Sequence, residues 1–422
     1  MTDEQRVAVI GCGVAGLTTA HILQRQHHVT LFERNDYLGG HTHTVLVPDG
    51  PDAGTPVDTG FIVCNTHTYP LFHRLLSQLD VGVRTSDMSF SYHDERTGFH
   101  YAGTCFNGLF SQRMNLLRPA FWGMLRDAAR FCRTGLAEIE AAAVPALSIA
   151  DYVKHHRYGT DFVEWYLAPM MAAIWSTPPG AVLAFPAEAL LRFFKNHGLL
   201  SIKNRPTWQT VVGGSHSYVQ AFAKTFKGAI RYPCPIQSIR RTDTAIIVTP
   251  KVGTPETFDR VVIATHADQA LALLADPSPE EQRLLGPWHY QDNHVILHTD
   301  ASVLPPKRRA WASWNYARED GADGTAPVSV TYDMNRLQGL QTEAQYCVSL
   351  NRRGEIPTRA NVRDLRYDHP IYTFESMGTQ GELSGLNGLG RTYFCGSYFG
   401  YGFHEDAVRS AVQVGQAFGI DL

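Results

Sequence analysis

The most specific chemical pattern in the sequence lies near its start, where residues 11–16 read G-C-G-V-A-G. The G-x-G-x-x-G spacing is typical of a loop that binds the diphosphate of a dinucleotide. Gly11 permits a tight turn, Gly13 lets the backbone approach the diphosphate, and Gly16 lets a helix pack closely against a strand. Val14 and Ala15 would begin that helix, whose unpaired N–H groups and positive dipole end attract phosphate. We therefore predict a dinucleotide site at this loop.

A carboxylate stands where the ribose of such a dinucleotide would lie. Glu33 follows Gly16 by 17 residues and can accept hydrogen bonds from ribose hydroxyls, while its charge disfavours the 2′-phosphate of NADP. The elements that must position these residues are predicted from apolar patterns: a strand over 6–10, a helix over about 14–26 and a strand over 28–33. This order of strand, loop, helix and strand is the context that the motif requires.

A second glycine-rich segment indicates which dinucleotide is bound. Residues 39 and 40 are a Gly-Gly pair about six residues past the ribose acid, and residues 58–60 read D-T-G. An NAD site does not need such a pair, which instead marks the loop that FAD proteins of the glutathione-reductase type extend along the cofactor. FAD is therefore the predicted cofactor, and the contacts predicted from these segments are Arg34, Gly39, Gly40, His41, Thr59 and Gly60.

The opening pattern, G-x-G-x-x-G followed by E-x-x-x-x-x-G-G and D-x-G, resembles the flavin amine oxidase superfamily. That group includes amine oxidases, phytoene-type desaturases and protoporphyrinogen oxidase. The chain departs from the pattern at His41, where an arginine is common. The resemblance implies an α/β fold, in which a Rossmann-type, glutathione-reductase-like FAD-binding domain is interleaved with an α+β substrate domain that has a mixed sheet and a helical cap.

Later segments extend the resemblance over nearly the full length. A glycine turn at 213–214 opens a helix at about residue 218, Ile236 begins a small β-meander beside the adenine, and Thr265 lies in an A-T turn that returns to the FAD domain. Gly396 ends a strand near the diphosphate and ribityl chain. A helix over about 405–418 then points at the isoalloxazine ring, with cofactor contacts implied for His404, Glu405, Asp406 and Ala407; Asp406 replaces the family's usual glycine.

These segments divide the chain into two interleaved domains. We expect the FAD-binding domain at 1–75, 205–270 and 385–422, and the substrate-binding domain with its helical cap at 76–204 and 271–384. The first insert is helix-like in its second half. The second insert has expected strands at 293–299, 327–332 and 345–350, and a surface loop at 321–324.

Composition restricts the function classes. The 422 residues are 44% hydrophobic and 18% charged with a net charge of −3, an ordinary globular balance that does not favour nucleic acid. Acids near the N-terminus disfavour a signal peptide, and no stretch is apolar enough to span a membrane. The seven scattered cysteines form no C-x-x-C pair, so we expect reduced thiols, a cytoplasmic location and no metal site.

Residues 105–133 interleave large apolar residues with five arginines, and their only acid is Asp127. Two interpretations are open. The stretch is either a contact surface that places the protein peripherally on the inner face of an anionic membrane, or a cap helix with a solvated basic face and an apolar core face. The arginines are Arg113, Arg118, Arg126, Arg130 and Arg133.

Within the superfamily the sequence is most similar to bacterial NAD/FAD-binding oxidoreductases whose genes commonly accompany cyclopropane-fatty-acyl-phospholipid synthase-like enzymes. The matching segments are F-I-V-C-N at 61–65, Y-P at 69–70, I-W-S at 174–176, H-G-L-L at 197–200, R-P-T-W at 205–208 and G-Y-G-F-H-E-D at 400–406. This resemblance implies an acyl-lipid or fatty-acid substrate, modified or methyl-branched, and a neighbouring lipid-modifying enzyme as a partner.

The leading hypothesis is a flavin-dependent lipid desaturase or dehydrogenase, in which flavin N5 takes a hydride from an acyl carbon and a proton leaves. Tyr398, Tyr401 and His404 are the candidate proton acceptors near the flavin. The alternatives are a redox-neutral flavin isomerase or mutase, an amine oxidase, and a non-catalytic flavoprotein partner of lipid enzymes. An amine oxidase usually pairs a lysine near N5 with an aromatic cage, and no lysine here aligns with that position.

Overall fold

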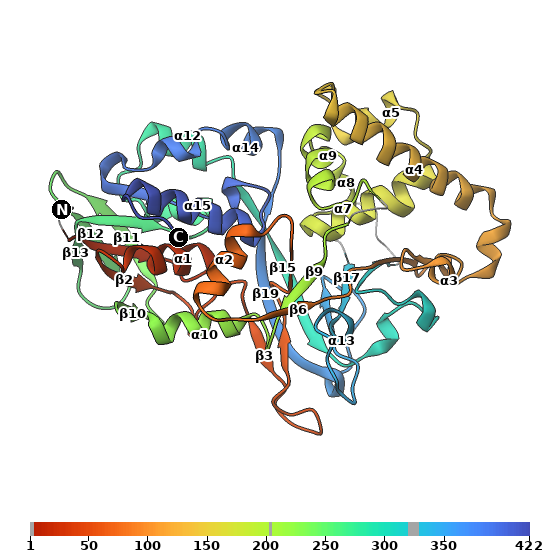
Figure 1. Cartoon of the computed structure of the whole chain (residues 1–422), viewed down its shortest axis with the longest axis horizontal. Coiled ribbons are helices and arrows are strands. Elements are labelled where there is room, and N and C mark those ends of the chain that lie inside the picture. The colour runs from red at the N-terminus through yellow and green to blue at the C-terminus, as the bar shows by residue number, and fades with distance from the viewer. Residues whose placement is uncertain (1–3, 202–204, 320–328) are drawn as a thin grey trace.

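The computed structural model describes residues 4–201, 205–319 and 329–422. The chain forms two lobes joined side by side, and both termini lie on the first lobe (Figure 1). The loop expected at 321–324 and the first two residues of the strand expected at 327–332 lie outside the described residues.

The first lobe is built on a parallel sheet of five strands, in the order β10-β2-β1-β14-β20. Its central strands are almost fully buried and read as short apolar runs, as expected for parallel strands covered on both faces. The strands are β1 (Arg6–Ile10), β2 (His28–Phe32), β10 (Ala229–Arg231), β14 (Arg260–Ile263) and β20 (Thr392–Phe394). This open parallel sheet confirms the expected α/β fold class.

Helices and a β-meander complete this lobe. Helix α1 (Val14–Leu23) lies against α15 (His404–Ala417), and the two run side by side in Figure 1. The meander is β11 (Ile236–Arg241), β12 (Ile246–Pro250) and β13 (Glu256–Phe258). The other helices are α2 (Pro70–Gln78), α10 (His216–Thr225), α11 (Ala267–Leu273), α12 (Pro279–Leu285) and α14 (Phe374–Thr379). Helix α1 is shorter than the expected 14–26, because tight turns after Leu23 reverse the chain into β2.

The second lobe contains a mixed sheet of seven strands, in the order β19-β15-β18-β17-β16-β7-β8. Strand β7 from the first insert pairs in parallel with β16 from the second, so both inserts contribute to one sheet. The strands are β7 (Phe90–Asp94), β8 (Phe99–Ala102), β15 (His289–His298), β16 (Trp314–Arg318), β17 (Ser329–Asp333), β18 (Cys347–Leu350) and β19 (Asn361–Ile371).

Two of these strands differ from expectation. Strand β15 begins four residues before the expected 293, because its antiparallel ladder with β19 continues to the pair His289 and Ile371. Strand β18 begins at Cys347, two residues after the expected 345. The mixed sheet itself confirms the expected architecture of the second domain, while the domain boundaries stay predictions.

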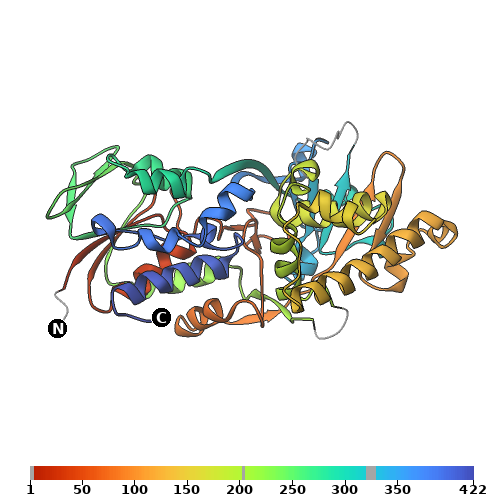
Figure 2. The ribbon, with the colours of Figure 1, turned by 90° about the horizontal axis from the view of Figure 1, so that it is seen from above.

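A layer of helices covers this lobe (Figure 2). It consists of α3 (Phe106–Leu109), α4 (Pro119–Glu140), α5 (Ile149–His155), α6 (Thr160–Phe162), α7 (Ala168–Trp175), α8 (Pro179–Val182) and α9 (Ala187–Asn196), with a π-helical turn η2 (Val163–Leu167). Helix α7 packs against β16 and β19, while α4 packs against α6 and α9. The second half of the first insert is therefore helical, as expected.

Short strands, one short helix and 3-10 turns complete the fold. The small strands are β3 (Thr44–Leu46), β4 (Pro56–Asp58), β5 (Val63–Asn65), β6 (Val83–Thr85) and β9 (Trp208–Val211), and α13 (Met334–Leu337) follows β17. The 3-10 turns are η1 (Arg113–Leu117), η3 (Ala301–Val303), η4 (Arg308–Ala310), η5 (Thr358–Ala360), η6 (Leu383–Leu386), η7 (Leu389–Arg391) and η8 (Ser397–Phe399).

A fully buried carboxylate ties the second insert to the first lobe. Asp58 accepts hydrogen bonds from the Ser215 N–H at 2.8 Å, from the Thr44 hydroxyl, and from the Gln338 side-chain amide at 3.1 Å. Ser215 lies just before α10, whereas Gln338 follows α13. Burial raises the pKa of Asp58 from 3.8 to about 6, although these donors oppose the shift.

Asp58 should therefore make stability depend on pH in a definite direction. Because the folded pKa lies above the unfolded value of 3.8, the folded state keeps the proton longer, and its stability falls as pH rises from about 4 to about 6. In Asp58→Asn this contribution is absent. Urea unfolding of both proteins across this range should show the wild-type free energy of unfolding falling relative to that of Asp58→Asn, by up to about 3 kcal/mol. Parallel pH profiles would contradict the assignment.

Candidate functional site

The glycine loop between β1 and α1 leaves a backbone cradle open. A Cβ at Gly16 would lie 1.9 Å from the Gly11 carbonyl oxygen, so only glycine lets α1 approach the loop this closely. A Cβ at Gly13 would meet no described atom within 4 Å. Gly13 is the N-cap of α1, and no side chain caps that helix end. The first N–H groups of α1 therefore remain available to an anion, and the space before Gly13 fits a diphosphate.

Glu33 closes one side of this cradle. Its buried carboxylate accepts the Cys12 N–H at 2.9 Å and the Asn35 N–H at 3.0 Å, one on each oxygen. Each oxygen keeps further acceptor capacity for a ribose hydroxyl. The Cys234 N–H donates to the Glu33 carbonyl oxygen at 2.6 Å. This hydrogen bond brings the start of β11, at Ile236, close to Glu33. Arg34 next to Glu33 is exposed.

The second glycine pair lies against the first loop. Gly39 donates its N–H to the Cys12 carbonyl oxygen at 2.9 Å, and a Cβ at Gly40 would lie 3.2 Å from the Gly13 Cα. Gly60 is packed onto His41, because a Cβ at Gly60 would lie 2.2 Å from the His41 carbonyl oxygen. The structure thus brings the two motifs that predicted FAD into direct contact.

Thr59 joins this region to the seven-stranded sheet. Its hydroxyl donates to the His43 carbonyl oxygen at 2.9 Å and lies 2.7 Å from the hydroxyl of Tyr367 on β19. Tyr367 also lies 3.0 Å from His43 Nδ1. A side chain of the second domain therefore reaches the loops predicted to hold the cofactor.

A cluster of half-buried histidines includes His41, which stands where an arginine is common in the family. The His41 ring centroid lies 5.9 Å from that of His266 and 5.4 Å from that of His369, and His266 stacks on Tyr290 at 4.3 Å. Burial lowers the pKa of all three histidines, to about 3 for His266 and His369. His41 Nε2 is buried without a hydrogen-bond partner among the described residues. An unpaired polar atom beside the glycine loops fits a polar ligand such as a cofactor.

The carboxyl ends of three parallel strands meet at the same place. A Cβ at Gly11, after β1, would lie 3.3 Å from the Thr265 side chain, after β14. A Cβ at Gly396, after β20, would lie 3.5 Å from the Thr265 carbonyl oxygen. Ligands of parallel α/β sheets bind at this edge. The predicted contacts Gly11, Thr265 and Gly396 are thus brought together, and their role in binding stays a prediction.

His404 begins α15 and is deeply embedded. Its ring stacks on Phe61, with centroids 3.5 Å apart and planes 12° apart. Its Nε2 lies 3.0 Å from the Thr42 hydroxyl and 3.4 Å from the Tyr218 hydroxyl. Burial holds the pKa of His404 well below 6.5, so the imidazole is neutral at pH 7.

The two acids after His404 are bound to backbone N–H groups. Glu405 accepts the N–H groups of Leu71 and Phe72 at 3.0 and 2.9 Å, at the start of α2. Asp406 accepts the N–H groups of Tyr401 and Phe403 at 2.9 and 3.1 Å and forms an ion pair with Arg409. Since these carboxylates hold neighbouring backbone, contact of this segment with a flavin would use the backbone of the first turn of α15. The buried Ala407 lies in the same turn.

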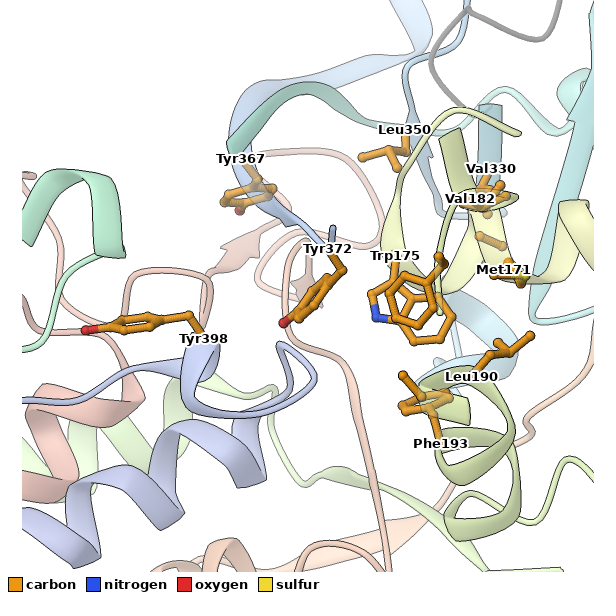
Figure 3. Packing of buried hydrophobic residues seen from close by; sticks show 14 of the residues in the cluster. Met171, Trp175, Val182, Leu190, Phe193, Val330, Leu350, Tyr367, Tyr372 and Tyr398 are labelled. Carbon is orange, nitrogen blue, oxygen red and sulfur yellow. The ribbon is translucent and has the colours of Figure 1, made fainter. Parts of the chain in front are cut away.

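An aromatic cluster lines the junction between this segment and the helical layer. Tyr398 and Tyr372 are buried, and neither hydroxyl has a hydrogen-bond partner among the described residues. Tyr372 lies between Tyr398 and the cap residues Trp175 and Phe193 (Figure 3). The Trp175 indole N–H donates to the Tyr401 carbonyl oxygen at 3.4 Å. Burial raises the pKa of Tyr398 well above 10, so its hydroxyl stays protonated.

Sequence reasoning missed several residues of this site. His266, His369, Tyr290 and Tyr367 carry no motif, and three of them lie on the long strands β15 and β19, where only the tertiary structure brings them to the loops. The signal for Trp175 was present in the I-W-S segment that the family resemblance singled out.

Other site types find no support in the part of the chain that the structure describes. No three His, Cys, Asp or Glu side chains there are placed to hold one metal ion, and all seven cysteines are unpaired. No helix within the described ranges has the length and hydropathy needed to cross a membrane.

Comparisons with known proteins agree with this geometry. A family model described as flavin containing amine oxidoreductase matches residues 14–417. A Mycobacterium tuberculosis protein that carries the name flavin-containing monoamine oxidase AofH is 25% identical over 342 residues, which are 78% of this chain and 70% of that protein.

Solved structures with similar folds share little sequence. A CLA-producing fatty acid isomerase from P. acnes superposes with a TM-score of 0.65 and 14% identity over 99% of both chains. Cyclohexylamine oxidase from Brevibacterium oxydans superposes with a TM-score of 0.67 and 14% identity over 98% of both chains. At this level of identity the likeness concerns the fold alone.

The open space before Gly13 gives a direct test of the loop. Gly13 has φ −68°, so a side chain needs no strained backbone, and its Cβ would meet only the space of the diphosphate. Gly13→Val should therefore fold with an unchanged melting temperature as apoprotein but lose most of its FAD. FAD released by heat denaturation, measured against protein concentration, gives the occupancy. Gly16→Val, whose Cβ would clash with the Gly11 carbonyl, should instead lose the fold. Normal FAD content in Gly13→Val would refute the loop assignment.

Glu33 allows a graded test. Glu33→Ala removes an acceptor for the ribose hydroxyls and leaves the Cys12 and Asn35 N–H groups with fewer partners. FAD affinity should fall by roughly 1–3 kcal/mol, while Glu33→Gln, which keeps one oxygen, should lose less. Titration of apoprotein with FAD, followed by flavin fluorescence, measures both constants. Equal affinity in wild type and Glu33→Ala would place the ribose elsewhere.

Proposed function

The chain belongs to the flavin-containing amine oxidoreductase family, and on this premise we propose that it dehydrogenates an acyl chain of a fatty acid or phospholipid. The family assignment makes the protein an FAD-dependent oxidoreductase. We propose that its substrate is a modified or methyl-branched acyl chain.

The residues that would hold FAD are those already gathered at the carboxyl edge of the parallel sheet. The N–H groups at the start of α1 would bind the diphosphate, Glu33 the ribose, and the backbone at the start of α15 the flavin end. FAD, when bound, supplies an acceptor for a hydride. The chain's own residues must orient the substrate, exclude water and manage the proton that leaves.

The observation that carries the proposal is the apolar and aromatic character of the lobe junction. The buried side chains that pack beside the C-terminal segment belong to one apolar cluster, which includes Trp175, Phe193, Tyr372 and Tyr398 (Figure 3). An acyl chain offers neither charge nor hydrogen bonds, so a dry apolar wall suits it. The unpaired hydroxyls of Tyr372 and Tyr398 would supply the few polar contacts that orient a substrate and its departing proton.

The lysines favour an acyl substrate over an amine. Amine oxidases of this superfamily usually place a lysine near flavin N5. Here every lysine that the structure describes is exposed, namely Lys154, Lys195, Lys224, Lys227, Lys251 and Lys307. None of these can be the buried lysine of an amine oxidase site.

The candidate proton acceptors are not equivalent. Tyr398 keeps its proton at pH 7, so it would donate a hydrogen bond or relay a proton rather than act as a base. His404 is neutral and therefore basic in principle, but its Nε2 faces Thr42 and Tyr218. Tyr401 borders the junction at the edge of Phe193, with ring centroids 5.9 Å apart.

Redox-neutral isomerisation of an acyl chain is the second candidate, because a fatty acid isomerase shares the fold over its full length. It would use the same site and the same apolar wall. The two reactions differ in the mass of the product: dehydrogenation removes two hydrogen atoms, whereas isomerisation leaves the mass unchanged.

We expect aerobic holoenzyme incubated with total membrane lipid and free fatty acids to yield an acyl product lighter by two hydrogen atoms, detected by mass spectrometry. Anaerobic addition of the same lipid should bleach the flavin absorbance, because electrons then remain on the cofactor. A parallel panel of primary amines should leave the absorbance unchanged. Bleaching by an amine with none by lipid would overturn the proposal in favour of amine oxidation, and a product of unchanged mass would favour isomerisation.

A further inference from the structure

Helix α3 and helix α4 lie at the outer side of the second lobe (Figure 1). Exposed apolar side chains are concentrated on α3, on η1 and at the start of α4. Five of the eleven exposed large apolar side chains among the described residues fall within residues 106–122, so they are concentrated rather than scattered. Phe106 is 70% exposed and Leu117 is 75% exposed. The members of this apolar patch are Phe106, Met114, Leu116, Leu117 and Trp122.

Ring contacts and a hydrogen bond join part of the patch to the core beneath it. The ring of Phe106 lies 4.7 Å from that of the buried Phe110, which lies 5.6 Å from that of Trp122. The Trp122 indole N–H donates to the Leu116 carbonyl oxygen at 3.0 Å, which fixes the indole over η1. An ordered, exposed apolar patch of this kind usually marks an interaction surface.

Basic side chains from two segments that are far apart in the sequence lie near the patch. Arg113 and Arg118 belong to the segment that forms the patch. The other basic residues come from η4, which contacts α3, and the Arg309 side chain donates to the Ser111 carbonyl oxygen at 3.1 Å. The exposed Lys307 and Arg308 lie beside Arg309. Within the described ranges, none of these five residues forms an ion pair with a carboxylate.

Two of the arginines in residues 105–133 are already paired with an acid and are less available to an anionic partner. Arg126 and Arg130 both pair with the buried Asp127, at 3.4 and 3.6 Å, and so balance an internal charge. No sequence pattern indicated that residues 307–309 lie near the same surface, because they are almost two hundred residues away along the chain.

We infer that this surface docks the protein on an anionic phospholipid bilayer. Apolar side chains can insert at the headgroup boundary, a tryptophan favours that boundary, and the surrounding cations attract anionic headgroups. A symmetric contact with a second copy would bring the same five cations against themselves, which disfavours that occupant. Docking on a bilayer rests on the proposed function, because an enzyme that acts on an insoluble acyl lipid must bind the bilayer to reach its substrate.

The patch also lies at the outer end of the apolar core that reaches the candidate site. Helix α4 begins at the patch and packs closely on α9, because a Cβ at Gly135 would lie 2.5 Å from the Leu191 side chain. Helix α9 also carries Phe193 of the aromatic junction. One apolar cluster contains both Phe110 beneath the patch and Tyr398 at the junction, so both belong to one continuous core.

Sedimentation with vesicles tests this surface on the holoenzyme. Wild type should sediment with phosphatidylcholine vesicles that contain about a third phosphatidylglycerol, and binding should weaken as salt rises. Phe106→Gln/Leu117→Gln should lower the partition coefficient by roughly tenfold or more. Lys307→Gln/Arg308→Gln should lower it by a similar factor at low salt and by less at high salt. All variants should keep wild-type FAD content.

Matched controls separate the surface from total charge. Lys224→Gln/Lys227→Gln makes the same change in net charge at the end of α10 and just after it, on the first lobe, and Val252→Gln removes a single apolar side chain that is 86% exposed there. Both controls should bind vesicles as wild type does. The inference is overturned if wild type does not bind anionic vesicles at low salt, if the patch variants bind as tightly as wild type, or if the patch variants change the oligomeric state in size-exclusion chromatography instead.

A second measurement keeps this result distinct from the proposed function. Activity on a short, water-soluble acyl substrate should be equal in wild type and the patch variants, because the patch lies away from the site. If vesicles bind through the patch but no acyl substrate is oxidised, the docking surface stands and the proposed function fails. If acyl substrates are oxidised without vesicle binding, the reverse holds.

Discussion

The close approach of α1 to the loop at residues 11–16 is the contact on which the site depends. No side chain fits between Gly16 and the Gly11 carbonyl, where a Cβ would lie 1.9 Å away. This contact seats the first turn of α1 at the carboxyl edge of the sheet, with its N–H groups directed at the cradle. Helix α15 packs along α1, so the C-terminal segment is positioned by the same contact. The rest of the site is assembled around an edge that three parallel strands share.

The second lobe reaches this edge through polar groups buried at the contact between lobes. Asp58 receives donors from both lobes, and Thr59 meets Tyr367 of β19. Burying a carboxylate is costly unless its oxygens are hydrogen-bonded, and here both are. Such pairing fixes how the substrate sheet sits against the cofactor loops, because a displaced lobe would leave these groups unpaired.

Much of the first lobe was predictable because its signals are local. The strand, glycine loop, helix and acid of residues 6–33 stand in one run of sequence, and the order of the later segments indicated the FAD fold. The strands of the second lobe were partly predictable from apolar patterns, but their pairing was not.

The histidine cluster was not predictable, because His41, His266 and His369 come from three segments whose proximity depends on the packing of one lobe against the other. The orientation of the Glu405 and Asp406 side chains was not predictable either. The motif predicts where their segment lies in the fold, whereas hydrogen bonds from nearby backbone N–H groups determine where each carboxylate points.

The histidine at position 41 alters how a diphosphate would be neutralised. An arginine carries a permanent positive charge, whereas burial keeps His41, His266 and His369 neutral by lowering the pKa of each. Neutral imidazoles offer N–H donors but no net charge. Beside these imidazoles, the N-terminal end of α1, whose dipole is equivalent to about half a positive charge, and the N–H groups of its first turn would face the negative charge of a diphosphate. The close contact of Gly16 with Gly11 thus bears on both the geometry and the electrostatics of the cradle, because it lets that helix end lie against the loop at the edge of the sheet.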